Sequence, residues 1–151
     1  MRKEKKAEHI YDQFSTEGLY EEANLDKNEI KKVLIMAMED YRFGKQLRKL
    51  HDPSWRVIFN IHYDVCRELC DQLMRFKRQK TSNHQALFAF IFLHFKNLEL
   101  DWKFLDNIRT TRNKNKYQGL DISKEMWKSA EIQLDLYISA LKKEIEERLN
   151  S

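Results

Sequence analysis

The chain has 151 residues, of which 42% are hydrophobic and 34% are charged. This length suits one domain with a sizeable core, and the composition excludes a wholly disordered chain. Three glycines and one proline are too few for the many turns of a β-sandwich or barrel, so we expect an all-α protein. The 28 basic and 24 acidic residues give a net charge of +4, which permits an acidic partner without requiring one.

The first part of the chain, residues 1–25, has the weakest pattern. A short helix over residues 2–14 would place Ile10 and Phe14 on one face. We therefore treat residues 1–25 as an N-terminal helix or extension. No linker or repeat divides the rest of the chain, so we expect a single domain over residues 1–151.

The next segment predicts an amphipathic helix that follows Asp26 and continues to Leu47. Asp26 and Glu29 have the spacing of a capping box, in which a side-chain oxygen accepts a hydrogen bond from an N–H of the first turn. Gly44 lies on the apolar stripe of this helix, where it costs about 1 kcal/mol relative to alanine. We expect that Gly44 permits the close approach of a neighbouring helix.

The third and fourth helices also have recognisable starts. Asp52 and Pro53 are expected to begin the third, as a cap residue followed by proline at the first helical position. The fourth is expected to begin near Ser82, with Gln85 completing a second capping box. It is apolar nearly all round, so its own bundle or a second chain has to cover most of it. Its apolar run, residues 86–95, is too short to span a bilayer, which needs about 20 residues.

The last two helices complete the predicted fold. The fifth should end near Gly119, and Ser123 should cap the sixth segment, whose apolar stripe continues to Leu149. Long helices with short connections pack as antiparallel neighbours. We therefore predict an antiparallel up-and-down bundle of about five helices, with no membrane segment.

Cys66 and Cys70 lie on successive turns of the predicted third helix, where a disulfide between them would constrain almost nothing. We interpret them as reduced thiols and therefore expect a cytoplasmic protein. His62 precedes them at the same interval, which is one spacing of metal ligands, but three ligands in line along one helix suit zinc poorly. We expect these side chains to pack in the core, and we expect no metal and no cofactor.

The segment from Arg109 to Gly119, RTTRNKNKYQG, is the strongest candidate for a polar site. Arg112 continues the inward stripe of its helix, where an arginine is costly unless it is paired or faces a cleft. Together with Asn113 and Tyr117, it can bind a phosphate or a base. The alternative is a structural network in which Arg112 is paired internally and Tyr117 packs with its hydroxyl satisfied.

Basic residues gather in two runs, and such runs can neutralise phosphates. The first run is Arg75, Lys77, Arg78 and Lys80, and the second is Arg109, Arg112, Lys114 and Lys116. Either run can instead be the solvated end of a helix, where cations complement the helix dipole. We take Arg109 and Lys116 as further candidates for contacts to a ligand, and the first run as a phosphate-contacting rim.

The ending RNKNKYQG, followed by a capped amphipathic helix, resembles the closing motif of the HEPN family. That motif is Arg-Asn, a short spacer, a Tyr and a nearby Gly, before the last long helix. The stretches NIHYDVCRELCDQL and SNHQALFAF resemble the family's third-helix pattern and the step that follows it. The resemblance spans residues 26–148 and implies a small antiparallel bundle, usually dimeric. Members of the family work in RNA cleavage, in toxin–antitoxin systems or beside minimal nucleotidyltransferases.

This chain departs from the family's RNA-cleaving members, which carry a histidine shortly after the arginine. Counted from Arg112, that histidine would stand at position 117, 118 or 119, where this chain has Tyr117, Gln118 and Gly119. Proton transfer from the ribose 2′-hydroxyl needs a group with a pKa of about 7, and tyrosine, at about 10, is a poor substitute. Arg112 remains a candidate catalytic residue because it can stabilise phosphate charge. The departure favours binding over cleavage.

Three hypotheses follow. The first is a HEPN-like protein that binds RNA or a nucleotide through Arg112, Asn113 and Tyr117, as a homodimer and with a nucleotidyltransferase or an antitoxin as partner. The second is a metal-independent ribonuclease whose acid–base group comes from elsewhere. His84 is the candidate for that role, and its alternative role is to seat the start of the fourth helix. The third is a structural protein-interaction module in which Arg112 is locked in an internal ion pair.

Overall fold

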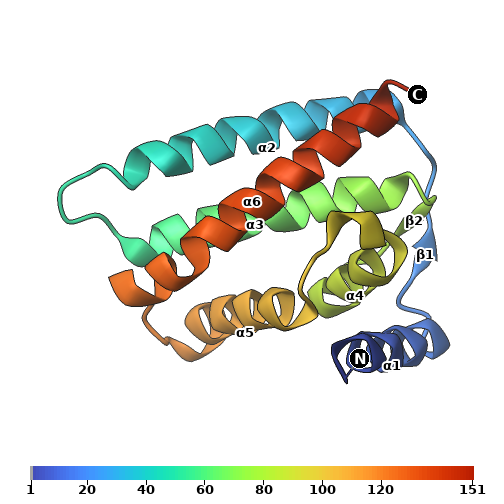
Figure 1. Ribbon diagram of the computed structural model, residues 1–151, viewed down its shortest axis with the longest axis horizontal. Coiled ribbons are helices and arrows are strands. Elements are labelled where there is room, and N and C mark those ends of the chain that lie inside the picture. The colour runs from blue at the N-terminus through green and yellow to red at the C-terminus, as the bar shows by residue number, and fades with distance from the viewer. Residues whose placement is uncertain (1) are drawn as a thin grey trace.

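The computed structural model describes residues 2–151, with side chains from residue 6 onward, and it confirms an all-α fold (Figure 1). The helices are α1 (Arg2–Thr16), α2 (Lys27–Leu47), α3 (Trp55–Arg75), α4 (His84–His94), α5 (Trp102–Gln118) and α6 (Lys124–Leu149). The short elements are the strands β1 (Glu21–Glu22) and β2 (Gln79–Lys80) and the 3-10 helix η1 (Lys96–Leu98). No helix within residues 2–151 has the combination of length and hydropathy that a bilayer crossing demands.

The helix α3 is the centre of the bundle. It packs against α2, α4, α5 and α6, and of these α2 and α5 run antiparallel to it (Figure 1). Because neighbours cover it on several sides, 12 of its 21 residues are buried. They include the fully buried Ile58, Leu69 and Leu73, which recur at helical intervals on one face. The predicted antiparallel bundle is therefore present. A polar site between α3 and a neighbouring helix is positioned by α3.

Three of the predicted helix ends are confirmed. The side chain of Asp26 accepts hydrogen bonds from two N–H groups in the first turn of α2. Ser123 caps α6 in the same way, by accepting from the third N–H of that helix. Gly119 ends α5 with φ of 70°, a left-handed conformation that glycine adopts at little cost.

Two predicted helix starts are wrong by one or two residues. The cap of α3 is Ser54, not Asp52, and Pro53 lies before the cap rather than in the first turn. The cap of α4 is Asn83, not Ser82. In both cases the residue next to the helix also has a side-chain oxygen, and that oxygen accepts a hydrogen bond from an N–H three residues later. The sequence offers two acceptors within three residues at each start, and the one nearer the helix is used.

Gly44 lies where α2 crosses α3, as the sequence predicts. A Cβ atom at this position would lie 2.8 Å from Cε1 of His62 and 3.0 Å from Cγ2 of Ile61. Both distances are shorter than van der Waals contact. The glycine therefore allows the two helices to approach at this point.

The apolar helix α4 is covered by the chain itself. Its residues from Ala86 to Ile91 are almost completely buried, because α1, α3 and α5 pack around it. The N-terminal helix supplies part of this cover through Ala7, which is fully buried, and Tyr11, whose ring lies 6.2 Å from that of Phe90. The apolar character of α4 therefore gives no argument for a second chain.

A short antiparallel pairing of β1 with β2 was not predicted. Glu21 lies opposite Lys80, and Glu22 lies opposite Gln79. A further backbone hydrogen bond joins the N–H of Ala23 to the loop after α3. This pairing leads the chain from α1, on one side of the bundle, to the start of α2 on the other (Figure 1).

Candidate functional site: an arginine cluster

Arg112 lies on the side of α5 that faces α3, and its side chain is 16% exposed. Its guanidinium carbon lies 5.5 Å from the centre of the Tyr63 ring, and its Nη2 lies 3.8 Å from Oδ1 of Asp64. The contact with Asp64 is an ion pair that is too long for a hydrogen bond. The Nε–H of Arg112 is buried and makes no hydrogen bond within the described chain. Arg112 therefore keeps unused donor capacity.

Arg112 lies near His84, the first residue of α4. Two further arginines, Arg67 and Arg109, lie near the same histidine. On α3, Nη2 of Arg67 lies 3.6 Å from a carboxylate oxygen of Glu68, and its Nε is buried without a hydrogen-bond partner in residues 2–151. On α5, Arg109 donates to its neighbour Asp106 at 2.8 Å. The arginine cluster, as we name it, consists of Tyr63, Arg67, His84, Arg109 and Arg112.

His84 is the first residue of α4, and its Nδ1 lies 3.1 Å from the Tyr63 hydroxyl. Burial, together with the charges of Arg67, Arg112 and Arg109, lowers its pKa to about 4, so the ring is neutral at pH 7. Burial also raises the pKa of Tyr63 above its ordinary value, so the phenol keeps its proton and can donate it to the histidine. Burial is the largest cause of the lowered pKa of His84, and the three arginine charges lower it further.

The structure brings Arg109, Arg112 and His84 together, but it leaves the other predicted site residues outside the cluster. Tyr117 is 78% exposed, so it is not packed in the core as the structural-network alternative expected. Lys116 is exposed and Asn113 is half-buried. Among the described side chains, none of these three forms a hydrogen bond or an ion pair. Tyr117 follows Arg112 by five residues, which turns it about 140° away around the helix.

Sequence reasoning missed Tyr63 and Arg67 on α3, and Asn115 on α5. Nδ2 of Asn60 donates to Oδ1 of Asn115 at 3.1 Å, and Asn115 donates to the carbonyl of Leu120 at 2.6 Å, which ties the end of α5 to α3. Tyr63 and Arg67 are four residues apart, which indicates a shared helix face. That interval does not say which helix lies against the face.

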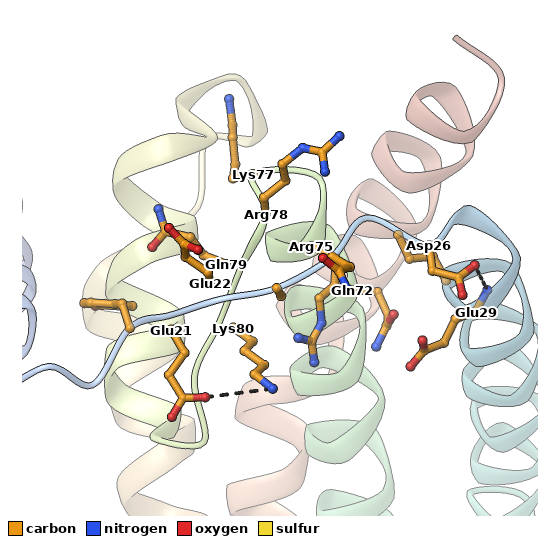
Figure 2. A pocket seen from close by; sticks show the side chains of 14 residues that line it. Glu21, Glu22, Asp26, Glu29, Gln72, Arg75, Lys77, Arg78, Gln79 and Lys80 are labelled. Atoms are coloured by element: carbon orange, nitrogen blue, oxygen red, sulfur yellow. Dashed lines mark hydrogen bonds and ion pairs between the residues drawn. The ribbon is translucent and has the colours of Figure 1, made fainter.

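The first basic run lines a different cleft, at the far end of α3 (Figure 2). This cleft, of about 1020 Å³, carries as many acidic as basic residues: Glu21, Glu22, Asp26, Glu29, Arg75, Lys77, Arg78 and Lys80. Lys80 lies 3.8 Å from Glu21, and Arg75 pairs with Asp71 at 3.1 Å. The helix rise between Asp64 and Arg75 is about 16 Å. The run is therefore offset by acidic neighbours and is not a rim of the arginine cluster.

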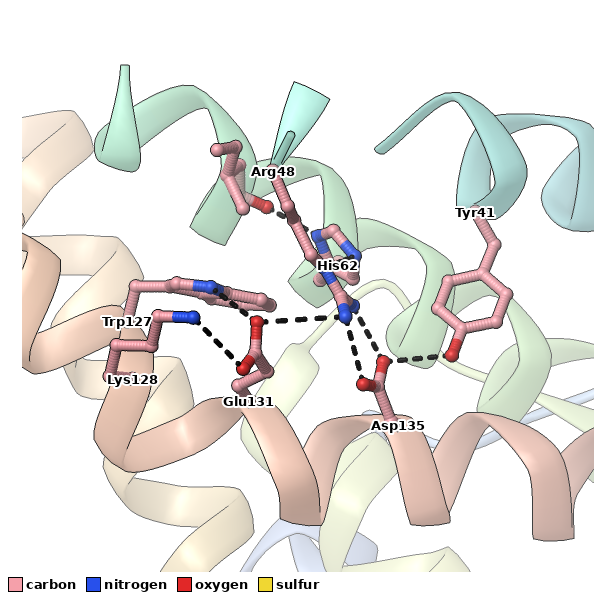
Figure 3. A network of polar contacts seen from close by, with 8 residues as sticks. Tyr41, Arg48, His62, Trp127, Lys128, Glu131 and Asp135 are labelled. Atoms are coloured by element: carbon pink, nitrogen blue, oxygen red, sulfur yellow. Dashed lines mark hydrogen bonds and ion pairs between the residues drawn. The ribbon is translucent and has the colours of Figure 1, made fainter. Parts of the chain in front are cut away.

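A second polar network is centred on Arg48, which directly follows α2 (Figure 3). Its guanidinium donates to both carboxylate oxygens of Asp135, at 2.9 and 2.6 Å, and its Nε donates to Nε2 of His62 at 3.2 Å. The guanidinium carbon lies 5.0 Å from the centre of the buried Trp127 ring. Tyr41 donates to the same carboxylate of Asp135 at 2.8 Å. One arginine thereby links α2, α3 and α6.

The two nitrogens of His62 are both engaged in this network. Nε2 accepts from Arg48, so Nδ1 carries the proton and donates to the carbonyl of Ile58 at 2.7 Å. Burial lowers the pKa of His62 to about 4, which keeps the ring neutral. Because its donors and acceptors are matched, we interpret the Arg48 network as a structural tie rather than a binding site.

The thiols of Cys66 and Cys70 are free and fully buried. A hydrogen bond from the Cys70 thiol to Cys66, together with burial, raises the pKa of Cys70 well above its ordinary value, so this thiol is protonated at neutral pH. Within the described part of the chain, no three His, Cys, Asp or Glu side chains converge as metal ligands would.

Comparison with known proteins leaves the function to be argued from the site itself. No family model, no curated protein and no solved structure matches the chain. Of the two polar networks, the Arg48 network is internally satisfied, whereas the arginine cluster has buried donors without acceptors. The arginine cluster is therefore the better candidate for a ligand site.

Proposed function

We propose that this chain is a HEPN-like helical protein that binds RNA or a nucleotide through the arginine cluster. The observation that carries the proposal is a group of unsatisfied polar atoms where α3 meets α5. Buried side-chain atoms without a hydrogen-bond partner in the described chain include Asn60 Oδ1, Asp64 Oδ1, Arg67 Nε and Arg112 Nε. Native proteins leave few such atoms, so a group of them at one place points to a ligand.

The chemistry of the two arginine donors, Arg67 Nε and Arg112 Nε, fits a phosphate. A buried donor without an acceptor costs about 1–3 kcal/mol, which a bound acceptor would recover. Phosphate oxygens accept from guanidinium groups, and these charge-assisted hydrogen bonds are stronger than neutral ones. A phosphate beside Arg67 and Arg112 would satisfy both Nε atoms, and the neutral ring of His84 supplies a further donor at Nε2. Asp64 is 41% exposed, so its carboxylate can turn toward solvent when an anion binds.

The sequence pattern supports the same assignment. Arg112 stands in the RNKNKYQG ending that resembles the HEPN motif, and the long helix α6 follows that ending. On this basis we expect a cytoplasmic homodimer with a nucleotidyltransferase or an antitoxin as partner. The reduced thiols of Cys66 and Cys70 fit a cytoplasmic setting. Size-exclusion chromatography with light scattering tests the dimer, and a monomer at micromolar concentration contradicts it.

The proposal is tested by fluorescence anisotropy of a labelled single-stranded RNA, measured over a range of salt concentrations. Arg112→Ala and Arg67→Ala should each weaken binding about tenfold or more, because each removes a charge-assisted hydrogen bond. Each should also lower the slope of log K against log salt by about 0.7, the value for one lost phosphate contact on a single strand.

The matched control is Arg42→Ala, which removes the same charge from an exposed position on α2. It should leave both the affinity and the salt slope nearly unchanged. Equal losses in Arg42→Ala and Arg112→Ala would mean that net charge alone drives binding, which contradicts the proposed site. If Arg112→Ala unfolds the protein while the wild type binds no RNA, the structural interaction module is the correct interpretation.

The second candidate is a metal-independent ribonuclease, which the position of His84 favours. In the other neutral tautomer of His84, Nδ1–H donates to the Tyr63 hydroxyl, and Nε2 would take the proton of a ribose 2′-hydroxyl, whose oxygen attacks the adjacent phosphorus. The 5′-oxygen would leave with a proton from water, which yields a 2′,3′-cyclic phosphate and a new 5′-hydroxyl end. A pKa of about 4 makes His84 a weak base, so binding without cleavage remains the first candidate.

Cleavage is tested by incubating the protein with total RNA in EDTA. Activity that is lost in both His84→Gln and Arg112→Ala, while both variants stay folded, would establish the ribonuclease. Binding without any cleavage would leave the first candidate in place. His9→Gln is a suitable control because it makes the same change at an exposed position on α1, outside the cluster.

A further inference from the structure

A second cleft lies on the other side of α3, where the loop between α2 and α3 meets the start of α6. It has a volume of about 520 Å³, within the range of small-ligand sites. Its lining residues are Arg48, Leu50, His51, Asp52, Pro53, Trp55, Lys124 and Lys128. This set combines basic groups with an aromatic ring and contains one carboxylate.

The basic residues come from three parts of the chain. Lys124 and Lys128 are one turn apart on the first turns of α6, and both are exposed. Arg48 forms the inner wall and is held in place by its two hydrogen bonds to Asp135. His51 is exposed in the loop. This arrangement favours an anion with more than one charged group, since the basic groups line the cleft from different sides.

Lys124 and Lys128 differ in whether they already form an ion pair. Nζ of Lys128 lies 3.3 Å from Glu131. Lys124 forms no ion pair within the described chain, and its Nζ lies 5.9 Å from the centre of the Trp55 ring. A contact at that distance is weak, so Lys124 can leave the ring for a phosphate at little cost.

Trp55 provides a flat surface next to these charges. Its ring is partly exposed, whereas the rings of Trp102 and Trp127 are buried in the core. Leu50 and Pro53 add apolar surface on the same loop. An aromatic face beside two lysines suits a ligand that has a flat ring joined to phosphates.

The cleft is separate from the arginine cluster. On α3, Arg67 and Asp64 lie about 140–200° around the helix from His62, which belongs to the Arg48 network. The two sites therefore use opposite faces of α3, and a ligand in one does not touch the other. A ligand can bind in this cleft whether or not RNA binds at the arginine cluster.

We propose that this cleft binds a nucleoside diphosphate or triphosphate. The base stacks on the Trp55 ring, and the phosphates bind Lys124, Lys128 and His51. Arg48 forms the inner wall and keeps its hydrogen bonds to Asp135 and its ion pair with Glu131, so the lysines carry the charge that the phosphates meet.

The test uses ADP, pyrophosphate and adenosine as probes of the whole protein, by calorimetry and by tryptophan fluorescence. Because Trp55 is the partly exposed tryptophan, bound ADP should quench the emission. ADP should bind at least about fivefold more tightly than pyrophosphate, which lacks the stacking ring, and adenosine should bind weakly. In Trp55→Phe, the quenching should disappear while calorimetry still detects ADP.

The matched pair of variants lies on one helix. Lys124→Ala with Lys128→Ala should weaken ADP binding about tenfold or more, because two phosphate contacts are lost. Lys142→Ala with Lys143→Ala removes the same charge from the other end of α6 and should change little. The proposal is overturned if ADP does not bind, if both double variants bind it equally, or if Arg112→Ala abolishes binding while the Lys124/Lys128 variant keeps it.

Discussion

The Tyr63 hydroxyl lies 3.1 Å from Nδ1 of His84, so a residue in the middle of α3 fixes the first side chain of α4. The same tyrosine ring carries the Arg112 guanidinium at 5.5 Å. A neutral histidine and a charged arginine thus share one aromatic support. A bound anion would offset the arginine charges, which add to burial in lowering the pKa of His84, and so would raise that pKa.

This relationship predicts that RNA binding tightens as the pH falls. In the protein without a ligand, His84 has a pKa of about 4. An anion at the cluster raises this pKa toward the ordinary value of about 6.5, so the protein takes up a proton when it binds the anion. Affinity should be constant above about pH 7 and should rise below it, by at most about tenfold per pH unit. Anisotropy titrations at several pH values measure this. His84→Gln should show a flatter profile, and an identical rise in that variant would contradict the role of His84.

The Arg48 network predicts acid sensitivity of the fold. His62 has a folded pKa of about 4, below its unfolded value of about 6.5, so the unfolded chain takes up the proton first. The neutral ring of His62 contributes on the order of 3 kcal/mol to the free energy of unfolding. This contribution is fully present above about pH 6.5 and is lost as the pH falls through 4. Urea unfolding across this range should show the loss. His62→Gln should be less stable at neutral pH but lose less on acidification, with the remainder due to His84 and to protonation of Asp135, whose pKa the Arg48 and Tyr41 hydrogen bonds lower.

Gly44→Ala should destabilise the protein, although alanine is the better helix former. The added Cβ would lie 2.8 Å from the His62 ring, and that ring cannot move without breaking its bonds to Arg48 and Ile58. We expect a net loss of about 1–3 kcal/mol after the propensity gain of about 1 kcal/mol. Thermal unfolding measures it, with exposed Ser139→Ala as the control. A higher melting temperature for Gly44→Ala would show that the helices are free to separate.

Asp135→Ala should cost about 2 kcal/mol or more, because it leaves the guanidinium of Arg48 and the hydroxyl of Tyr41 without their acceptor. Glu146→Ala removes a carboxylate of the same helix that has only an exposed ion pair, and it should cost less than about 1 kcal/mol. Chemical denaturation of both variants gives the comparison. Combining Asp135→Ala with Tyr41→Phe should cost less than the sum of the single changes, because the two groups share one hydrogen bond.

Local features of the chain were predictable where the cause is local. Asp26, Ser123 and Gly119 end their helices as their side chains and spacing indicate, and Gly44 marks a helix crossing. The Arg48 network was not predictable, because its members are separated by up to 94 residues and meet only in the folded chain.

The candidate site divides in the same way. The inward position of Arg112 follows from the helical period, and the structure confirms that its side chain is largely buried. The arrival of His84 and Arg67 at the same place depends on how α3, α4 and α5 pack. Asn113 and Tyr117 seemed close to Arg112 because they are close in sequence, but one helix carries them to different faces.

The cover that α1 places over α4 has a consequence for the order of synthesis. Tyr20 donates to the carbonyl of Ala86, 66 residues later, at 2.8 Å. At about 5–20 residues per second, the ribosome adds that stretch in about 3–13 s. During this time the N-terminal helix exists without the surface on which it docks. When α4 is synthesised, α1 is therefore already available to pack on it. This shortens the time for which the phenylalanines of α4 are exposed to other nascent chains.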